Sequence, residues 1–493
     1  ARASATWTDE LIVVDSSLEN GLREGYSNIT EWALSSYLTR MHYNYDRRYL
    51  VTASIRADGT SKFADRWGFF PSVALAWRAS NESFLSNVRW LSDLKLRGSF
   101  GVTGNNSIGN YQYMSLMGGS SAVLGSGGES IVSGIRLNSY GNPDLTWEQT
   151  KQTNIGVDLG IFKHRINFIV DYYNKQTEDL LLNLQVPSNM GFSNVMSNIG
   201  KVQNRGWEFT VDTRNLVGKF KWNSSFNITF NKQKVLALGP EGDPLWGNSI
   251  YLENTHITRV GDPMGLFYGL KVIGIYQNQE QVDALPSIST GVARSRPGEY
   301  IFENVNDTDN EITLDDRTVI GNPHPDFVFG LRNSFSYKNI SLSVLLRGSY
   351  GGDIINLNFG NIPYSLQYNG HVSLKNRWQS EEEPGDGRIP RLSSETRAVL
   401  GSTTFNSSFV EDGSFLNVQN VTLSYDLPKK IANTIKVESI STQLSVNNLL
   451  MFTKYNGWNP EGGMYTDTTL SPGLDWGRYP LSRVYTLGLN LTF

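Results

Sequence analysis

An alternation of apolar and polar side chains, with a period of two residues, recurs along most of the chain. In 219–231 every odd position is polar, and five of the six even positions are apolar: Phe220, Trp222, Phe226, Ile228 and Phe230. The same alternation is present in 94–102, 164–172 and 485–493. Because successive side chains of a β-strand point to opposite faces of its sheet, this pattern predicts half-buried strands.

Thirteen such strands are expected, near 32–44, 47–57, 68–79, 94–104, 150–160, 164–176, 204–214, 219–231, 327–337, 340–350, 414–426, 440–450 and 482–493. Short connections are expected at 44–47, 161–163, 215–218 and 338–339, and long ones at 105–149, 177–203, 232–326, 351–413 and 451–481. Outer-membrane barrels have short periplasmic turns and long external loops. If the short connections lie on the inside and the long ones on the outside, the two sides alternate without a conflict along the whole chain.

Two features favour a membrane barrel over a soluble sandwich or jelly roll, whose strands also alternate. The polar positions carry Lys, Arg, Asp and Asn in strand after strand, as a water-filled lumen requires, and the apolar positions are rich in Phe, Trp, Tyr and Leu. A spanning helix needs about 20 consecutive apolar residues, but the longest aliphatic runs here are about four residues, as at Leu11–Val14. The sequence therefore predicts an all-β chain that forms a transmembrane antiparallel β-barrel in a bacterial outer membrane.

The odd number of strands predicts that part of the barrel lies upstream of this sequence. Single-chain bacterial barrels have even numbers of strands, and unpaired sheet edges are untenable in lipid. We expect residues 1–31 in an external loop and residues 32–493 in the C-terminal portion of the barrel. Plugged transporters have 22 strands, which leaves nine strands for a missing N-terminal fragment. No apolar signal-peptide region opens the chain, so Ala1 is not expected to be the natural start of the precursor.

The amino-acid composition excludes several kinds of site and partner. The chain has no cysteine, which excludes disulfides, thiolate zinc sites and cysteine nucleophiles. Lys plus Arg number 43 against 47 for Asp plus Glu, so nothing indicates a nucleic-acid partner. Aromatic residues make up 12% of the chain and there are 47 glycines, which fits a barrel with aromatic girdles and close strand contacts.

Several longer motifs occur along the chain. They are YLVTASIRADGTS at 49–61, RWGFFPSVA at 66–74, NPDLTWE at 142–148, GNPHPDF at 321–327, EDGSFL at 411–416, NVTL at 420–423 with Pro428 and Lys429, and Tyr479-Pro480 with GLNLTF at 488–493. These motifs resemble those of the SusC/RagA group of TonB-dependent outer-membrane transporters. Their order and spacing extend the resemblance from about residue 33 to the end of the chain.

This resemblance implies a 22-stranded barrel with an N-terminal plug, energised through TonB, and a SusD-like surface lipoprotein that acts as a lid. The TonB box, the plug and the first strands do not occur in this sequence, so energy coupling is implied by the resemblance alone. As in other outer-membrane barrels, Phe493 at the end of an alternating strand is expected to act as a barrel-assembly signal. The alternative for Phe493 is an ordinary lipid-facing side chain.

An acidic segment resembles a calcium-binding loop, in which several oxygens converge from alternate positions and a later carboxylate closes the shell. The candidate ligands for Ca²⁺ are Asn304, Asn306, Asp307, Asp309 and Asp316. The segment departs from the usual pattern because Val305 stands at the first ligand position and Asn310 at the position of the invariant glycine. The alternative is a solvated acidic turn.

The external loops are rich in aromatic residues, which could stack on sugar rings or peptide side chains. The candidate substrate-binding residues are Trp246, Tyr251, Tyr364, Tyr368, Trp378, Tyr455, Trp458 and Trp476, and Tyr465 lies in the same class of loop. For any one of them the alternative is loop packing or an interfacial girdle.

No catalytic constellation emerges, and the chain is not expected to be an enzyme. The five histidines are far apart in sequence, none in a zinc-binding spacing, and the run Glu381–Glu383 is interpreted as a solvated loop. The hypothesis is active import of an oligosaccharide or oligopeptide too large for porins. The alternatives are a passive porin-like channel, an outer-membrane barrel enzyme, or a structural or adhesive barrel.

Overall fold

A computed structural model describes most of the chain. The described residues are 29–124, 130–185, 191, 194–239, 242–248, 254–288, 295–306, 310–358, 372–392, 405–434, 436–461 and 469–493. The predicted external segment 1–31 thus lies almost wholly outside them. No helix in the described ranges is long and apolar enough to cross a membrane.

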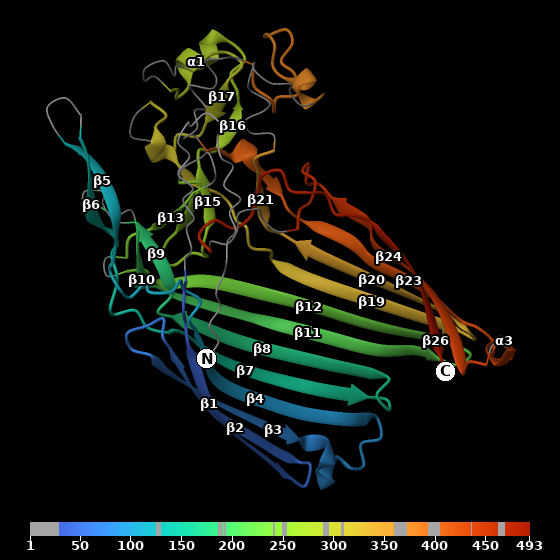
Figure 1. Cartoon of the computed structure of the whole chain (residues 1–493). Helices are drawn as coiled ribbons and strands as arrows, with labels where there is room; N and C mark the ends of the chain where they lie inside the picture. Colours follow the sequence, from blue (N-terminus) through green and yellow to red (C-terminus); the bar gives the residue numbers. More distant parts are fainter. Residues whose placement is uncertain are drawn as a thin grey trace, which may run out of the picture. The chain divides into compact units, whose positions relative to one another are not determined.

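Thirteen strands of the described chain form one sheet, in the order β1-β2-β3-β4-β7-β8-β11-β12-β19-β20-β23-β24-β26 (Figure 1). They are β1 (Leu34–Tyr45), β2 (Tyr49–Thr60), β3 (Trp67–Arg78), β4 (Leu91–Asn105), β7 (Glu148–Ile161), β8 (Ile166–Glu178), β11 (Lys201–Val217), β12 (Phe220–Ala237), β19 (Phe327–Tyr337), β20 (Ile340–Tyr350), β23 (Phe415–Asp426), β24 (Ser439–Thr453) and β26 (Val484–Thr492). Each strand pairs with its predecessor in this series, which is an antiparallel meander. The all-β prediction and the thirteen-stranded antiparallel sheet are confirmed.

Tight turns close several hairpins at one end of the sheet. The turn between β1 and β2 places Asp46 and Arg47 at φ +53° and +54°, and the turn between β19 and β20 places Lys338 at +53°. Two-residue hairpin turns favour such left-handed backbone because its twist matches that of the strands. Two hairpins have longer turns: β3–β4 holds two 3₁₀ turns, and β23–β24 holds the short helix α3 (Lys429–Thr434) over a small core of Ala432, Val437 and Ile440.

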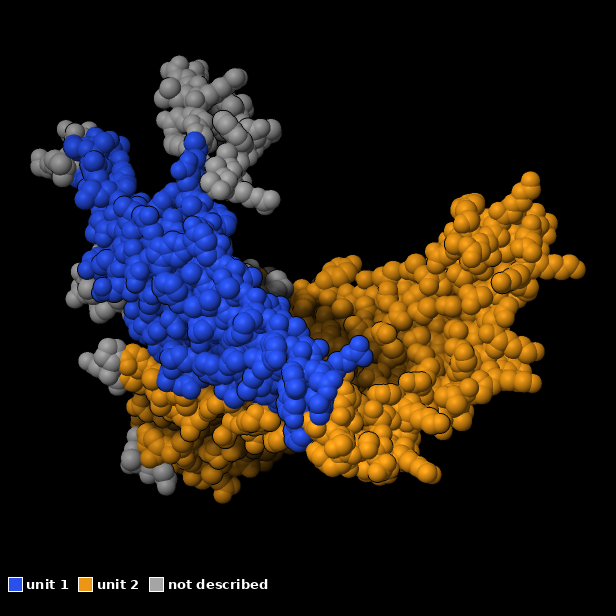
Figure 2. Space-filling view, turned by 90° about the horizontal axis from the view of Figure 1, so that it is seen from below, with its two compact units in different colours: residues 1–77, 97–154, 175–202 blue, residues 78–96, 155–174, 203–493 orange. Residues whose placement is uncertain are grey.

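The chain divides into two compact units, coloured separately in Figure 2. Unit 1 comprises residues 1–77, 97–154 and 175–202, and unit 2 comprises residues 78–96, 155–174 and 203–493. Unit 1 contains the hairpins β5 (Leu116–Leu124)–β6 (Ser130–Ser139) and β9 (Leu181–Gln185)–β10 (Asn194–Asn198). Its core joins Phe63, Phe70, Ile108, Leu145 and Trp147.

In unit 2 the long connections fold into a loop assembly with small sheets of its own. One sheet joins β13 (Leu245–Gly247), β14 (His256–Thr258), β15 (Leu266–Gly269) and β18 (Thr318–Gly321); the others join β16 (Val272–Ile275) with β17 (Tyr300–Phe302), and β21 (Asp353–Asn356) with β22 (Val410–Asp412) and β25 (Leu474–Asp475). The short helices of the described chain are, besides α3, α1 (Gln279–Ala284) and the 3₁₀ turns Ala79–Asn81, Ser83–Leu85, Leu314–Asp316, Val372–Asn376 and Ser407–Phe409.

Two hydrophobic clusters hold this loop assembly together. One joins Phe267, Ile355, Phe405 and Leu474, among others, and the second joins Leu270, Tyr300, Phe302 and Trp378, among others. Residues far apart in sequence thus bury apolar surface against one another, which stabilises loops that have little regular secondary structure.

Candidate functional site

The two faces of the sheet in unit 2 differ in polarity, as the paired strands β12 and β19 illustrate. On one face Phe226 lies opposite Leu331 and Ile228 opposite Phe329, and the rings of Phe226 and Phe329 are 6.5 Å apart. The opposite face of the same strands carries Asn223, Ser225, Asn227, Arg332 and Ser334. A wall one strand thick therefore presents an apolar surface on one side and a polar surface on the other.

The polar face carries a cavity of about 280 Å³ near the tight-turn ends of β8, β11, β12 and β19. Its charged lining consists of Asp212, Arg214 and Arg332, and amide and hydroxyl groups complete the wall. Among the lining residues, Asn223, Ser225 and Arg332 occupy positions of the polar face. The cavity is consistent with a wet passage along this face.

The alternation changes phase in β23. Leu345 of β20 pairs with Asn420, but Leu346 pairs with Val418, so Gln419 has no partner in β20. Such a bulge lets two residues oppose one. As a result Asn417 and Asn420, three positions apart, both belong to the polar face.

A second irregularity lies opposite the bulge, in β24. Asn447 pairs with Asn420, while Leu450 pairs with Val418. Between them Asn448 adopts a left-handed backbone with φ +52°, a conformation that asparagine tolerates better than most residues. The irregularity brings the Asn448 side chain within reach of Asn417.

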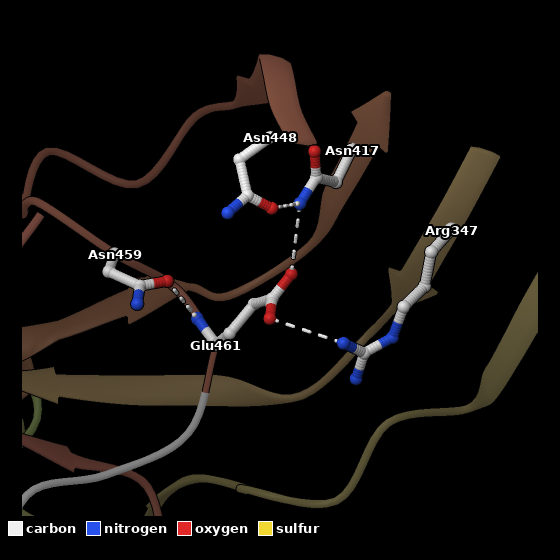
Figure 3. A network of polar contacts seen from close by, with 5 residues as sticks. All are labelled: Arg347, Asn417, Asn448, Asn459 and Glu461. Carbon is white, nitrogen blue, oxygen red and sulfur yellow. Dashed lines mark hydrogen bonds and ion pairs between the residues drawn. The ribbon is translucent and has the colours of Figure 1, made fainter. Parts of the chain in front are cut away.

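The long connection after β24 folds back onto this part of the wall (Figure 3). The Arg347 Nη1 donates to Glu461 Oε2 at 3.2 Å, and Asn417 Nδ2 donates to Glu461 Oε1 at 3.3 Å and to Asn448 Oδ1 at 3.5 Å. The Glu461 amide in turn donates to Asn459 Oδ1 at 2.9 Å. Glu461 thus anchors the connection to strands of the polar face.

A buried carboxylate forms a second junction within the loop assembly. The Asp475 side chain is fully buried and accepts hydrogen bonds from the Tyr455 hydroxyl at 2.5 Å and from Asn358 Nδ2 at 3.1 Å. Burial, followed by the neighbouring Asp475 carboxylate, raises the pKa of the Tyr455 hydroxyl. Tyr455 therefore stays a hydrogen-bond donor at physiological pH, and Asp475 joins the connection after β24 to the one that contains Asn358.

His256 forms a third junction. It is fully buried, its Nε2 lies 2.9 Å from the Pro472 carbonyl oxygen, and its Nδ1 lies 2.8 Å from Thr255 Oγ1. A carbonyl oxygen can only accept, so Nε2 carries the proton and the Thr255 hydroxyl donates to Nδ1. Burial lowers the pKa of His256 to about 4. The neutral imidazole thus connects β14 to the distant segment around Pro472.

Several candidate substrate-binding aromatics are packed inside the loop assembly. Trp378 is 8% exposed and its Nε1 donates to Gln277 Oε1 at 3.2 Å, Tyr455 is 5% exposed, and Trp476 packs partly buried against the cluster around Phe267. At these positions the side chains serve the packing of the loops and have little surface left for a ligand. Tyr251, Tyr364, Tyr368 and Tyr465 lie outside the described residues.

Trp246 and Trp458 differ in their surroundings. The Arg317 guanidinium lies 5.6 Å from the Trp246 ring centroid and 5.5 Å from that of Tyr268, which is the geometry of a cation–π contact. Trp458 is 70% exposed. Among the described candidates, Trp458 offers the largest free ring surface, and substrate binding by these residues stays a prediction.

Among the candidate calcium ligands, Asp316 has the best-defined surroundings. The Asp316 carboxylate is fully buried and accepts hydrogen bonds from the backbone amides of Val305, Asn306 and Thr313 at 2.8–3.1 Å. Asp316 therefore closes this loop by capping its backbone. Asn304 and Asn306 lie in the segment that it caps, Asp307 and Asp309 fall outside the described residues, and the calcium site stays a prediction.

Phe493 follows the last strand and is 88% exposed. An assembly signal acts through recognition by a separate protein. The predicted role of Phe493 as such a signal therefore stays a prediction.

Sequence reasoning missed the anchoring residues Arg347, Asn417 and Glu461. One signal was present, because the Asn417-to-Asn420 spacing of three breaks a strict period of two and indicates a bulge. Glu461 carried no comparable signal, since it lies in a connection without periodicity.

Known proteins resemble this chain over most of its length. The family model described as "TonB dependent receptor-like, beta-barrel" matches residues 13–449. TonB-dependent receptor P3 of Formosa agariphila is 34% identical over 478 residues, covering 95% of this chain and 46% of that protein. TonB-dependent receptor SusC of Bacteroides thetaiotaomicron is 30% identical, covering 96% of this chain and 45% of that protein. The chain therefore spans about half the length of the curated relatives it matches.

A solved structure has the same fold. The RagAB peptide transporter superposes with a TM-score of 0.79 at 25% sequence identity, over 99% of this chain and 50% of that one. The predicted SusC/RagA resemblance and the outer-membrane location are confirmed. This chain belongs to the TonB-dependent receptor family and forms part of its outer-membrane β-barrel.

Proposed function

We propose that the chain forms most of the wall and the external loop assembly of a receptor for TonB-dependent active import of a large nutrient. The cargo would be an oligosaccharide or an oligopeptide. A plug and the remaining strands would come from the part of the receptor that precedes this chain, and TonB would act through that plug. No bond of the cargo is broken in this scheme.

The observation that carries the proposal is the attachment of a structured loop assembly to the polar wall through Glu461. Diffusion through a passive pore needs an open passage and no ligand pocket. Here the loops have two hydrophobic clusters, small sheets and buried polar junctions at Asp475 and His256. Contacts of this kind hold the loops in one arrangement, which lets them present fixed polar groups to a ligand as preformed binding sites do.

The polar wall suits a cargo rich in hydroxyl or amide groups. Next to the bulge, Asn420 Nδ2 donates to Asn447 Oδ1 at 2.7 Å and to Ser445 Oγ at 3.0 Å, and Thr422 donates to Asn420 at 2.9 Å. These groups are neutral donors and acceptors, which bind sugars and peptide bonds alike. They do not distinguish the two cargo classes.

A SusD-like lipoprotein lid would contact the external hairpin β5–β6. One face of this hairpin carries Met117, Val123, Ile131 and Ile135, which are 62–78% exposed. An isolated two-stranded hairpin is marginally stable in water, and a cluster of exposed apolar side chains favours a protein partner. We expect Ile131→Asp with Ile135→Asp to abolish copurification of the lipoprotein, whereas Val132→Asp on the other face should leave it intact.

Uptake by cells tests the import proposal. The full-length receptor is restored to a strain that lacks it, and uptake of labelled oligosaccharides and oligopeptides is followed with and without a protonophore. We expect uptake of one class that stops when the inner membrane is de-energised. Uptake that persists, with swelling of liposomes in small solutes, would indicate a passive channel instead, and hydrolysis of the cargo by purified receptor would indicate an enzyme.

A further inference from the structure

One end of the sheet in unit 2 carries a row of five turns, four of which have a net positive charge. These turns, within the described residues, are 79–90, 162–165, 218–219, 338–339 and 427–438. Successive hairpins of an antiparallel meander lie about 10 Å apart, since neighbouring strands are about 4.8 Å apart. Figure 1 shows α3 of the last turn at the end of the strands away from β13 and β15. Because short turns face the periplasm, this row forms the periplasmic rim of the barrel wall.

Hydrogen bonds join neighbouring turns along the rim. The Phe162 amide donates to the Trp90 carbonyl at 2.7 Å, and the Arg165 guanidinium donates to the Asn215 carbonyl at 2.8 Å. Further along, the Asp426 amide donates to the Asn339 carbonyl at 2.9 Å. The turns therefore hold fixed positions relative to their neighbours, and their charges add up along one edge.

The rim has a strong excess of positive charge. The five turns contain the eight cations Arg89, Lys163, Arg165, Lys219, Lys338, Lys429, Lys430 and Lys436, against only Glu82 and Glu438. All eight are exposed, and within the described part of the chain none of them forms an ion pair with a carboxylate. Turn geometry alone does not require this, because Asp suits tight turns at least as well as Lys.

The external end has the opposite charge. The connection 238–326 contains fourteen Asp and Glu residues against five Lys and Arg. The positive charge is therefore a property of the periplasmic rim and not of the surface as a whole.

Exposed rings lie among the cations. Phe84, Trp90, Phe162 and Tyr337 are 47–67% exposed, and Lys338 Nζ lies 5.5 Å from the centroid of the Tyr337 ring. Aromatic side chains of this kind occupy the headgroup level of a bilayer. The rim thus places its ammonium and guanidinium groups where lipid phosphates lie.

We propose that this rim binds the phosphate groups of anionic phospholipids in the periplasmic leaflet of the membrane. Zwitterionic lipids offer the same phosphate together with a cation, so a rim with eight cations against two acids prefers lipids whose headgroup has a net negative charge. The preference is electrostatic and falls with ionic strength. It is independent of the cargo and of the import proposal.

Spin-labelled lipids test this preference on the full-length receptor in phosphatidylcholine vesicles. Trace amounts of labelled phosphatidylglycerol or phosphatidylcholine are added, and the motionally restricted fraction gives their relative association with the protein surface. We expect phosphatidylglycerol to be preferred, with the preference decreasing between about 50 mM and 1 M salt. The variant Lys429→Glu with Lys430→Glu should lower the association of phosphatidylglycerol roughly fivefold or more.

The matched control reverses two exposed cations of the external loops, Lys375→Glu with Arg388→Glu, and should keep the wild-type preference. Folding of each variant is checked by its mobility on unheated gels, and Lys429→Gln with Lys430→Gln replaces the first variant if that one does not fold. Equal association of the two lipids, or equal losses in the rim variant and the control, would overturn the proposal. So would binding of soluble peptidoglycan fragments without any preference between lipids.

Discussion

Arg347 and Glu461 are 114 positions apart in sequence, yet their side chains form an ion pair at 3.2 Å on the polar face of the sheet. The Arg347 side chain is 51% exposed and that of Glu461 is 20% exposed. Ion pairs with this degree of exposure contribute less than about 1 kcal/mol. The pair therefore serves to position the connection after β24 more than to stabilise the barrel.

Replacement of Glu461 by Gln should release this connection without unfolding the wall. We expect the urea midpoint of the barrel to change little and the rate of limited proteolysis between residues 454 and 483 to rise. The variant Glu383→Gln, in an exposed loop, is the control. If E461Q and E383Q were cleaved at the rate of the wild type, the connection would be held by other contacts.

Asn448 should tolerate glycine but not valine. Its backbone has φ +52°, and for a residue with a branched side chain the left-handed region costs roughly 1–2 kcal/mol. Asn448→Val should therefore lower the free energy of unfolding, whereas Asn448→Gly keeps the backbone geometry. Urea unfolding of the two variants in lipid vesicles measures the difference, and equal midpoints would mean that the irregularity in β24 is not required.

A charge introduced on one face of β12 should destabilise the barrel, whereas the same charge on the other face should not. Phe226→Arg places a guanidinium on the apolar face, which costs roughly 2–4 kcal/mol near the bilayer midplane. Asn227→Arg, one position along, places the same group on the polar face and should be nearly neutral. The folded fraction of each variant in vesicles gives the comparison, and similar losses for both would contradict the assignment of faces.

The long strands were predictable because their alternation extends over many residues. β19 (Phe327–Tyr337) and β20 (Ile340–Tyr350) begin and end where the pattern predicts. β12 extends to Ala237, beyond the predicted end at 231, so it continues past the alternating segment into the long connection that follows. The short strands of the loop assembly were not predicted, since three buried residues such as His256–Thr258 show no period.

The candidate site was less predictable than the fold for a related reason. Trp378 and Trp458 both lie in long connections and are chemically identical, yet one is 8% and the other 70% exposed. Their difference arises from contacts between connections, such as that of Trp378 with Gln277, 101 positions away. Such contacts depend on the assembled strands and have no local pattern in sequence.

Substitution of these two tryptophans distinguishes an effect on cargo binding from an effect on loop packing. Trp378→Ala removes a buried ring and should destabilise the loop assembly by roughly 3–5 kcal/mol. Trp458→Ala should change stability by less than about 0.5 kcal/mol, and it should weaken cargo binding if its ring stacks on the cargo. Hydrogen exchange of the loops and cargo titration by calorimetry measure the two effects, and unchanged affinity in W458A would exclude Trp458 from the binding surface.

His256 should make the loop assembly sensitive to acid. Burial lowers its pKa from 6.5 to about 4, so an unfolded loop takes up a proton as the pH falls below about 6.5, while the folded loop stays neutral until about 4. Protons therefore favour the unfolded form in this window, and local stability, complete above pH 6.5, decreases toward pH 4. The difference corresponds to at most roughly 3 kcal/mol.

Hydrogen exchange of β14 and β15 as a function of pH measures this loss after correction for the intrinsic exchange rate. His256→Gln removes the titrating group and should flatten the dependence between pH 6.5 and 4, at the cost of a lower stability above pH 6.5 because the bond to the Pro472 carbonyl is perturbed. Amides of β19 and β20, which belong to the thirteen-stranded sheet and not to the sheet that contains β14, are the internal control. If the variant kept the pH dependence of the wild type, protonation of other groups would be responsible for the loss of stability in acid.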